Sequence, residues 1–200
     1  MLGDSIPETR AVCSSALKSL TKGMGDEKLN LIPWLVEGLK SPVGSVERSG
    51  AAQGLSQVLS VLNIERFEAV LPQVLNNADS VDTNAREGAI GLFVYLPKAM
   101  GEPLIAYMPQ ILPVILEGIA DDAETVRSVA MRAGESVVNE YALSSVSLLL
   151  PPLESGLFSE NWRIRQSSVQ LLGDLLVKLS DPESSVTLSE EEKRLNCKKL

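Results

Sequence analysis

A repeated arginine constrains the fold of this chain more than any other feature of its 200 residues. Five arginines follow one another at intervals of 38, 38, 41 and 38 residues: Arg10, Arg48, Arg86, Arg127 and Arg165. Three residues after each arginine comes a small side chain, and seven residues after it a large apolar one, except at Gly134. Because these offsets place side chains on one face of a helix, the repeat predicts five similar helices.

Proline recurs with a similar period in the apolar segments that precede the last four arginines. Pro33, Pro72, Pro113 and Pro152 each lie 13 to 15 residues before the arginine of their unit. Proline inside a helix removes a backbone donor and kinks the helix, so we expect a bent helix in each segment. Three of the segments end with glycine and an apolar residue, at Gly38-Leu39, Gly118-Ile119 and Gly156-Leu157, which predicts helix ends there.

Each unit is therefore expected to hold a helix A, a short polar linker and a helix B that begins near the arginine. Helix pairs of about 40 residues are typical of HEAT-type α-solenoids, so we predict an all-α fold. The expected pairs follow a leading single helix from about Pro7 to Leu20 and run roughly from Lys28 to Leu62, Ile64 to Leu96, Lys98 to Asn139 and Tyr141 to Leu179. The unpaired first helix indicates a piece of a longer array.

The last part of the chain departs from the repeat. After Leu179 the register stops, and the final 20 residues hold five acidic and four basic side chains with few apolar ones. Such a composition does not bury enough apolar surface to order a chain. We therefore expect the HEAT-repeat array to span residues 1–180 and residues 181–200 to be a polar, disordered tail.

Composition excludes most catalytic chemistry. The chain has no histidine, so it has neither a Ser-His-Asp triad nor an imidazole zinc site. Its two cysteines, Cys13 and Cys197, are too few for a disulfide framework or a Cys-rich metal site. No glycine-rich phosphate loop occurs either. We predict a protein that is not an enzyme, needs no cofactor and resides in a reducing compartment, the cytosol or the nucleus.

Charge and hydropathy exclude two further kinds of partner. The 18 basic and 26 acidic residues give a net charge of −8, which opposes non-specific binding to nucleic acid, so no direct DNA binding is expected. The first residues lack the basic and apolar regions of a signal peptide. The most apolar stretches, residues 104–119 and 143–157, are interrupted by prolines and a glutamate, so no membrane span is expected.

The arginine ladder, formed by Arg10, Arg48, Arg86, Arg127 and Arg165, has two interpretations. Arginine binds phosphate and carboxylate ligands, so the ladder could be a binding row. Near a helix start it can also bridge neighbouring units through acidic or carbonyl partners, and acidic residues closely precede four of the five. We favour this structural interpretation. Cys13 occupies the small-residue position of its unit, which likewise favours packing over a reactive thiol.

Two tryptophans are candidates for a protein contact, because tryptophan is enriched at interaction hot spots. We expect Trp34 and Trp162 to be buried between repeats. The segment 161–165, which contains Trp162 and Arg163, is nevertheless the best candidate for an exposed contact.

Three segments carry a resemblance to a known family. Residues 46–55 (VERSGAAQGL), 148–158 (LLLPPLESGLF) and 161–176 (NWRIRQSSVQLLGDLL) resemble Gcn-type translational activators, very large ribosome-associated HEAT proteins. The resemblance covers approximately residues 29–179 and implies the elongation-factor-three-like part of the array. It further implies association with ribosomes and activation of the amino-acid-starvation kinase that phosphorylates the alpha subunit of initiation factor two. The family's kinase-binding segment lies further toward the C-terminus, and nothing in this chain matches it.

We therefore expect a non-enzymatic HEAT scaffold in translational control, with the ribosome and the stress-kinase machinery as partners. The alternative is a HEAT adaptor for protein assembly in transport or phosphatase complexes. Ribosome binding favours a basic surface, yet residues 1–180 hold 21 acidic and 14 basic side chains. Contact with a ribosome would have to use local patches or ribosomal proteins.

Overall fold

The structure, a computed structural model, describes residues 1–180. In this range the chain forms helices and loops and no strand. None of these helices combines the length and the apolar character needed to cross a membrane. The elements are α1 (Pro7–Met24), α2 (Asp26–Leu29), α3 (Leu31–Gly38), α4 (Ser45–Leu59), α5 (Ile64–Ala78), α6 (Thr83–Met100), the 3-10 helix η1 (Glu102–Tyr107), α7 (Met108–Ile119), α8 (Glu124–Tyr141), α9 (Val146–Leu157) and α10 (Trp162–Ser180). The predicted tail, 181–200, lies outside the described residues.

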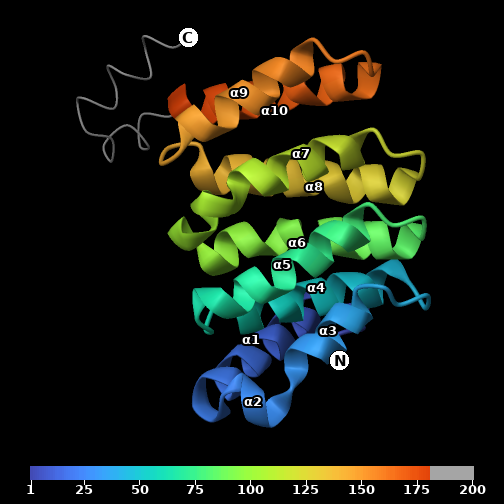
Figure 1. Cartoon of the computed structure of the whole chain (residues 1–200), viewed down its shortest axis with the longest axis vertical. Helices are drawn as coiled ribbons and strands as arrows, with labels where there is room; N and C mark the ends of the chain where they lie inside the picture. The colour runs from blue at the N-terminus through green and yellow to red at the C-terminus, as the bar shows by residue number, and fades with distance from the viewer. Residues whose placement is uncertain (181–200) are drawn as a thin grey trace.

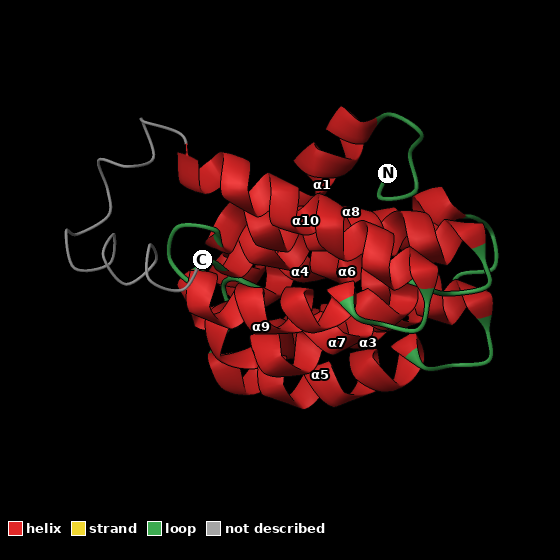
Figure 2. Cartoon of the chain, turned by 90° about the horizontal axis from the view of Figure 1, so that it is seen from above, coloured by secondary structure: helices red, strands yellow, loops and turns green. Residues whose placement is uncertain are grey.

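The helices form two layers that rise along the long axis of the molecule (Figure 1). Layer A holds α3, α5, η1, α7 and α9, and layer B holds α1, α4, α6, α8 and α10 (Figure 2). The successive pairs α3–α4, α5–α6, α7–α8 and α9–α10 stack on one another, and α1 packs on α4 at the first end. The predicted all-α solenoid of four helix pairs and a leading single helix is confirmed.

Several helix boundaries differ by a few residues from the approximate ones predicted. The first helix continues beyond Leu20 to Met24, and α6 continues through Pro97 to Met100, so the third unit does not begin at Lys98. The helix ends instead where Gly101 adopts a φ of 62°, a conformation that glycine accepts without strain, and donates its N–H to the Pro97 carbonyl. Layer A of this unit begins with η1, and the fourth unit begins with α9 rather than at Tyr141.

The periodic prolines lie in helix A of each unit, but not all in the predicted setting. Pro72, Pro113 and Pro152 lie inside α5, α7 and α9. Pro33 is the third residue of α3, where a backbone N–H has no partner within the helix in any case. In this unit the chain turns earlier, at Asn30, which has a φ of 47°.

Small residues set the spacing between the two helices of a unit. A Cβ atom on Gly38 would lie 2.9 Å from the Ala51 Cβ, and one on Gly118 would lie 3.1 Å from the Ala130 Cβ. A Cβ on Gly156 would overlap the Ser168 hydroxyl. These glycines lie near the predicted ends of helix A. Each of them packs against the small residue that lies three positions after the arginine of the same unit. The glycine and its small partner therefore let helices A and B approach closely.

The large apolar side chains seven positions after the arginines face the core. Leu55 and Phe93 are fully buried, and Leu17 and Leu172 pack half-buried against it. The exception in the repeat, Gly134, has a packing reason: Leu171 of α10 occupies the space, and its Cδ1 would lie 3.0 Å from a Cβ on Gly134. Cys13, which lacks an opposing helix A, is half-buried and free.

The units contact one another through backbone as well as side chains. At Gly88 in α6 an added Cβ would overlap the carbonyl oxygen of Leu39, which follows α3. At Gly50 in α4 it would overlap the carbonyl oxygen of Leu2. Leu2, just before α1, thus packs on α4 in the way that Leu39 packs on α6.

Polar bonds between units are concentrated in the middle of the array. Ser49 of α4 and Tyr95 of α6 share a hydrogen bond of 2.7 Å between their hydroxyl groups. In the next junction Ser136 donates to the Val94 carbonyl and Tyr141 to the Gly101 carbonyl, both at 2.8 Å. Among the described residues no hydrogen bond or ion pair joins the α9–α10 unit to the units before it, and apolar contacts hold this last junction.

The close approach at Gly88 yields a stability prediction. Gly88→Ala places a methyl group against the Leu39 backbone, so we expect the free energy of unfolding to fall by about 2 to 3 kcal/mol. Gly173→Ala in α10 is the matched control, because nothing lies within 4 Å of its added Cβ and alanine favours helix by up to about 1 kcal/mol. Urea denaturation measures both variants. Equal shifts for the two would contradict the close contact between the units.

Candidate functional site

Every arginine of the ladder bonds the linker that precedes its own helix. In each case Nη1 donates to one or two backbone carbonyls five to seven residues earlier, at 2.6 to 3.2 Å. The accepting residues are Asp4 and Ser5 for Arg10, Ser41 for Arg48, Ser80 and Val81 for Arg86, Asp121 and Asp122 for Arg127, and Ser159 and Glu160 for Arg165. The guanidinium group thus closes the loop between helices A and B.

Two of the arginines also reach a carboxylate in the following unit. Arg48 Nη2 lies 2.9 Å from Glu87 Oε2, and both side chains are buried. Arg86 bonds Asp121 with two nitrogens, Nε to Oδ2 at 2.7 Å and Nη2 to Oδ1 at 3.0 Å. Asp121 therefore pairs with the arginine of the preceding unit, although Arg127 is much closer in sequence. These bonds support the structural interpretation of the ladder.

The Arg86–Asp121 pair shifts the protonation of both groups. The hydrogen bonds from Arg86 lower the pKa of Asp121, and the N–H of Ala123, which donates to the same carboxylate at 2.8 Å, lowers it further. In return the hydrogen bond to Asp121 raises the pKa of Arg86. The pair therefore stays charged at physiological pH, and Asp121 ties the linker of its unit to the unit before.

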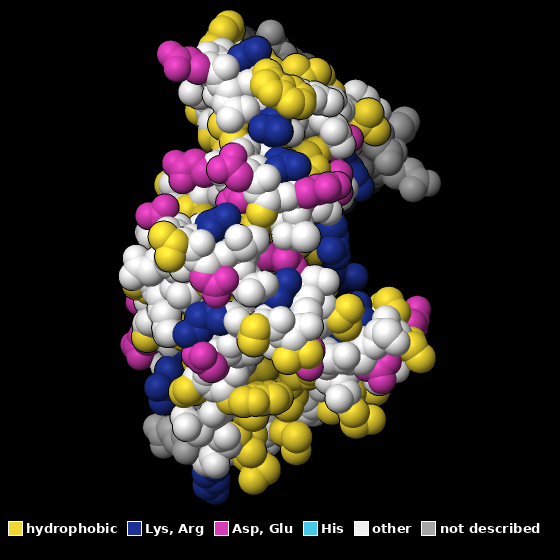
Figure 3. Space-filling view, turned by 90° about the vertical axis from the view of Figure 1, so that its right-hand side faces the viewer, with side chains coloured by type: hydrophobic (Ala, Val, Ile, Leu, Met, Phe, Trp, Pro, Cys, Tyr) yellow, Lys and Arg dark blue, Asp and Glu magenta, His cyan; other side chains and the backbone are white. Residues whose placement is uncertain are grey.

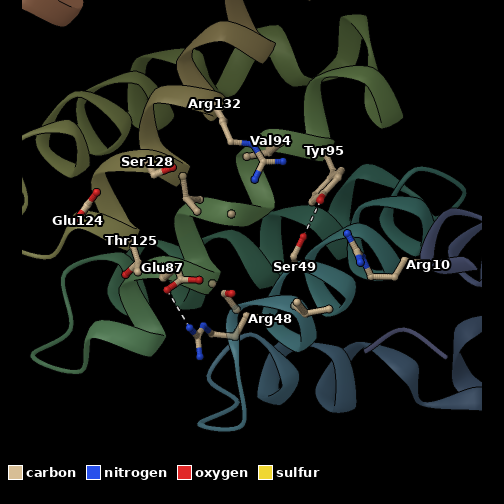
Figure 4. Close-up of a pocket in the computed structure, with 15 residues that line it drawn as sticks. Arg10, Arg48, Ser49, Glu87, Val94, Tyr95, Glu124, Thr125, Ser128 and Arg132 are labelled. Carbon is tan, nitrogen blue, oxygen red and sulfur yellow. Dashed lines mark hydrogen bonds and ion pairs between the residues drawn. The ribbon is translucent and has the colours of Figure 1, made fainter. Parts of the chain in front are cut away.

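A groove runs along the face of layer B. It consists of two adjoining hollows of about 450 and 440 Å³ that share Glu124 and Ser128, and we call it the B-face groove. The first hollow lies over α4, α6 and α8 (Figure 4), and the second lies between α8 and α10. Its charged lining residues are Arg10, Arg48, Glu87, Glu124, Arg127, Arg132 and Arg163.

The first hollow has both apolar and polar side chains in its lining. Figure 4 shows Arg132 above it and the Ser49–Tyr95 hydroxyl pair on its wall, with Arg10 at its edge. Arg132 is exposed, whereas the Nε atoms of Arg10 and Arg48 are buried without a hydrogen-bond partner. The sequence did not indicate Tyr95 or Arg132 as groove residues, because neither recurs with the repeat. The signal that could have found Arg132 is the charge of the helix B segments, which is more basic than that of the helix A segments. No such signal marks Tyr95.

The two tryptophans are exposed, so the expected burial is wrong for both. Trp34 is 58% exposed because the buried residues of α3 are Ile32, Leu35 and Val36, which leaves Trp34 on the opposite side. Trp162 is 57% exposed at the start of α10 and lines the second hollow. The guanidinium carbon of Arg163 lies 5.0 Å from the centre of its ring, within range of a cation–π contact. The contact role of Trp162 and Arg163 stays a prediction.

The lowered pKa of Asp121 yields a pH prediction. Because the unfolded chain takes up this proton at a higher pH than the folded chain, the stabilisation is complete at neutral pH and is lost as pH falls below about 4. Asp121→Asn keeps the shape and the acceptor for Ala123 but removes the charge. We expect it to lower the free energy of unfolding by about 2 kcal/mol at pH 7, and by much less at pH 3.

Asp122→Asn is the matched control, since Asp122 is exposed and acts on Arg86 through its charge alone, without a described hydrogen bond. Urea denaturation between pH 3 and pH 7 measures both variants. If Asp121→Asn lowered the free energy of unfolding by the same amount at every pH, the charge pair with Arg86 would not be the source of the stabilisation.

Comparison with known proteins places the chain in a family. The EF3 N-terminal HEAT repeat family matches residues 48–189. The eIF-2-alpha kinase activator GCN1 of Dictyostelium discoideum is 49% identical over 181 residues, which is 90% of this chain and 7% of that protein. The stalled ribosome sensor GCN1 of Homo sapiens is 46% identical over 187 residues, 92% of this chain and 7% of that protein.

A third relative, the eIF-2-alpha kinase activator GCN1 of Saccharomyces cerevisiae, is 40% identical over 190 residues, 94% of this chain and 7% of that protein. The chain thus spans about 7% of the length of these curated relatives. The similarity runs through almost the whole of the chain, and the predicted resemblance to Gcn-type activators is confirmed. The chain belongs to the EF3 N-terminal HEAT repeat family.

Proposed function

We propose that the chain is a non-enzymatic HEAT scaffold in cytoplasmic translational control. The observation that carries the proposal is the identity of 40 to 49% over at least 90% of the chain to proteins named eIF-2-alpha kinase activator and stalled ribosome sensor. The partners proposed on this basis are the ribosome and the machinery of the starvation kinase. The chain corresponds to a small part of each relative. Its proposed role is therefore to support the assembly of a complex.

The geometry supports a scaffold in two ways. The arginines of the ladder donate to carbonyls within the solenoid, so the repeated feature of the sequence stabilises the array. The groups that face solvent in the B-face groove are spread over α4, α6, α8 and α10 and do not converge on a single point. A surface spread over several repeats suits the binding of a large partner.

Trp162 and Arg163 are the proposed contact residues. Both line the groove between α8 and α10, and the tryptophan ring offers an exposed apolar surface beside a cation. Such a ring loses little conformational entropy on binding and buries a large area, which is why tryptophan and arginine are frequent anchors at interfaces.

Co-sedimentation with purified ribosomes tests the proposed function. We expect the 200-residue chain to sediment with ribosomes at low salt and to bind more weakly as salt rises, since local charged patches would carry part of the contact. An unrelated acidic HEAT fragment of similar size is the control. Binding no greater than that of the control would overturn the proposal that this stretch contacts the ribosome.

Paired tryptophan variants test the contact residues. We expect Trp162→Ala to weaken ribosome binding by about tenfold, as truncation of an interface anchor does. Trp34→Ala removes an equally exposed tryptophan from layer A at the other end of the array and is expected to leave binding unchanged. Circular dichroism checks that both variants fold. Equal binding by the two would exclude Trp162 as an anchor.

A further inference from the structure

The two layers of the solenoid carry charge of opposite sign. The helices of layer B hold eleven basic and seven acidic residues, a net charge of +4. The helices of layer A hold one basic and six acidic residues, a net charge of −5. The net charge of −8 of the whole chain therefore conceals a basic layer. A large acidic partner would meet this layer through its local charge.

The basic layer is also the hollowed one. Seen from its loop side the molecule is concave along one edge, and Lys and Arg side chains lie along the hollow (Figure 3). This hollow is on the layer B side of the molecule, where α1 projects further out than the other helices of the layer (Figure 2). A concave wall of low dielectric concentrates the field of such charges, so we expect the shape of this face to add to the effect of its arginines on an anionic ligand.

Within the groove the positive charges exceed the negative ones. Arg48 and Glu87 neutralise each other in their buried ion pair. Four cations and one acid then remain along the lining: Arg10, Arg127, Arg132, Arg163 and Glu124. Arg10 and Arg127 donate hydrogen bonds to neutral carbonyls, although the charge of Arg127 also acts on the carboxylate of Asp121, and exposed Arg132 makes no described bond.

The rest of the lining mixes polar and apolar side chains, which suits an extended polypeptide. Hydroxyl and amide groups such as those of Ser49, Ser128 and Gln166 lie between the arginines on successive helices, beside apolar residues such as Val94 and Met131. These groups can donate to and accept from the backbone of an extended chain, and arginine binds carboxylates through two parallel hydrogen bonds. The groove crosses successive helices rather than closing around one point, which fits a linear ligand.

We propose that the B-face groove binds an acidic segment of a partner protein in an extended conformation, with carboxylates of the segment on Arg132 and Arg163. Single-stranded RNA is the other linear polyanion, but its bases need free aromatic faces. Of the aromatic residues that line the groove, Tyr95 is half-buried and bonded to Ser49, which leaves Trp162 alone to stack on a base, whereas an extended RNA strand presents several bases. The proposal goes beyond the scaffold function, since it concerns the chemistry of the ligand and holds whether or not the chain binds ribosomes.

Fluorescence anisotropy with defined probes tests the ligand class. The first probe is a labelled 15-residue peptide in which glutamate alternates with glycine or serine, and the second has glutamine in place of every glutamate. We expect the first to bind the 200-residue chain and to weaken as salt rises, and the second not to bind. Equal binding of the two peptides, or binding of a 15-nucleotide polyuridine in preference to the acidic peptide, would overturn the proposal.

Charge-reversal variants test the place of binding. We expect Arg132→Glu to weaken binding of the acidic peptide at least tenfold, and the neutral Arg132→Gln to weaken it less. Lys98→Glu is the matched control: it makes the same change of charge at an exposed residue of layer B that does not line the groove, so less than a twofold effect is expected. Equal loss in Arg132→Glu and Lys98→Glu would mean general attraction and would overturn the proposed groove.

Discussion

The bond between each ladder arginine and the carbonyl groups of the linker before it is the interaction on which the array depends. A tight turn between two packed helices leaves backbone carbonyls without partners, and one guanidinium group satisfies them while its side chain stays on the first turn of helix B. The direction in which helix B leaves the linker is thereby fixed. Repetition of the same bond in five places gives the units a common geometry and brings their B helices into one layer.

The small residues then determine how near the helices lie. Where glycine faces alanine, as at Gly118 and Ala130, or where glycine faces a carbonyl oxygen, as at Gly88, the backbones come into contact and larger side chains are directed into the core. The arginine therefore fixes direction and the small residues fix distance. The charge separation between the layers is compatible with this packing, since most charged side chains lie outside the core.

The sequence was sufficient for the fold because both determinants recur with the period of the unit. It was not sufficient for the ion pairs, since the partners of Arg48 and Arg86 lie 39 and 35 residues downstream while other acids are adjacent in sequence. Only the stacking of units brings these distant carboxylates near. The groove could not be predicted for the same reason. Tyr95 and Arg132 belong to different helices, and they line one hollow because α6 and α8 stack side by side, which no local pattern in the sequence indicates. Addition of the charges helix by helix would nevertheless have separated the two layers.

The uneven distribution of polar bonds between units has a mechanical consequence. Hydrogen bonds are directional, so the junctions joined through Ser49–Tyr95, Ser136–Val94 and Tyr141–Gly101 resist sliding and twisting. The junction before α9 and α10 depends on apolar contacts such as that of Leu171 with Gly134, which tolerate small displacements. Among the described residues no hydrogen bond joins α1 to α4 either, so both ends of the array depend on packing alone. Under load the solenoid would flex at these two end junctions first, and the spacing between α8 and Trp162 would change with its curvature.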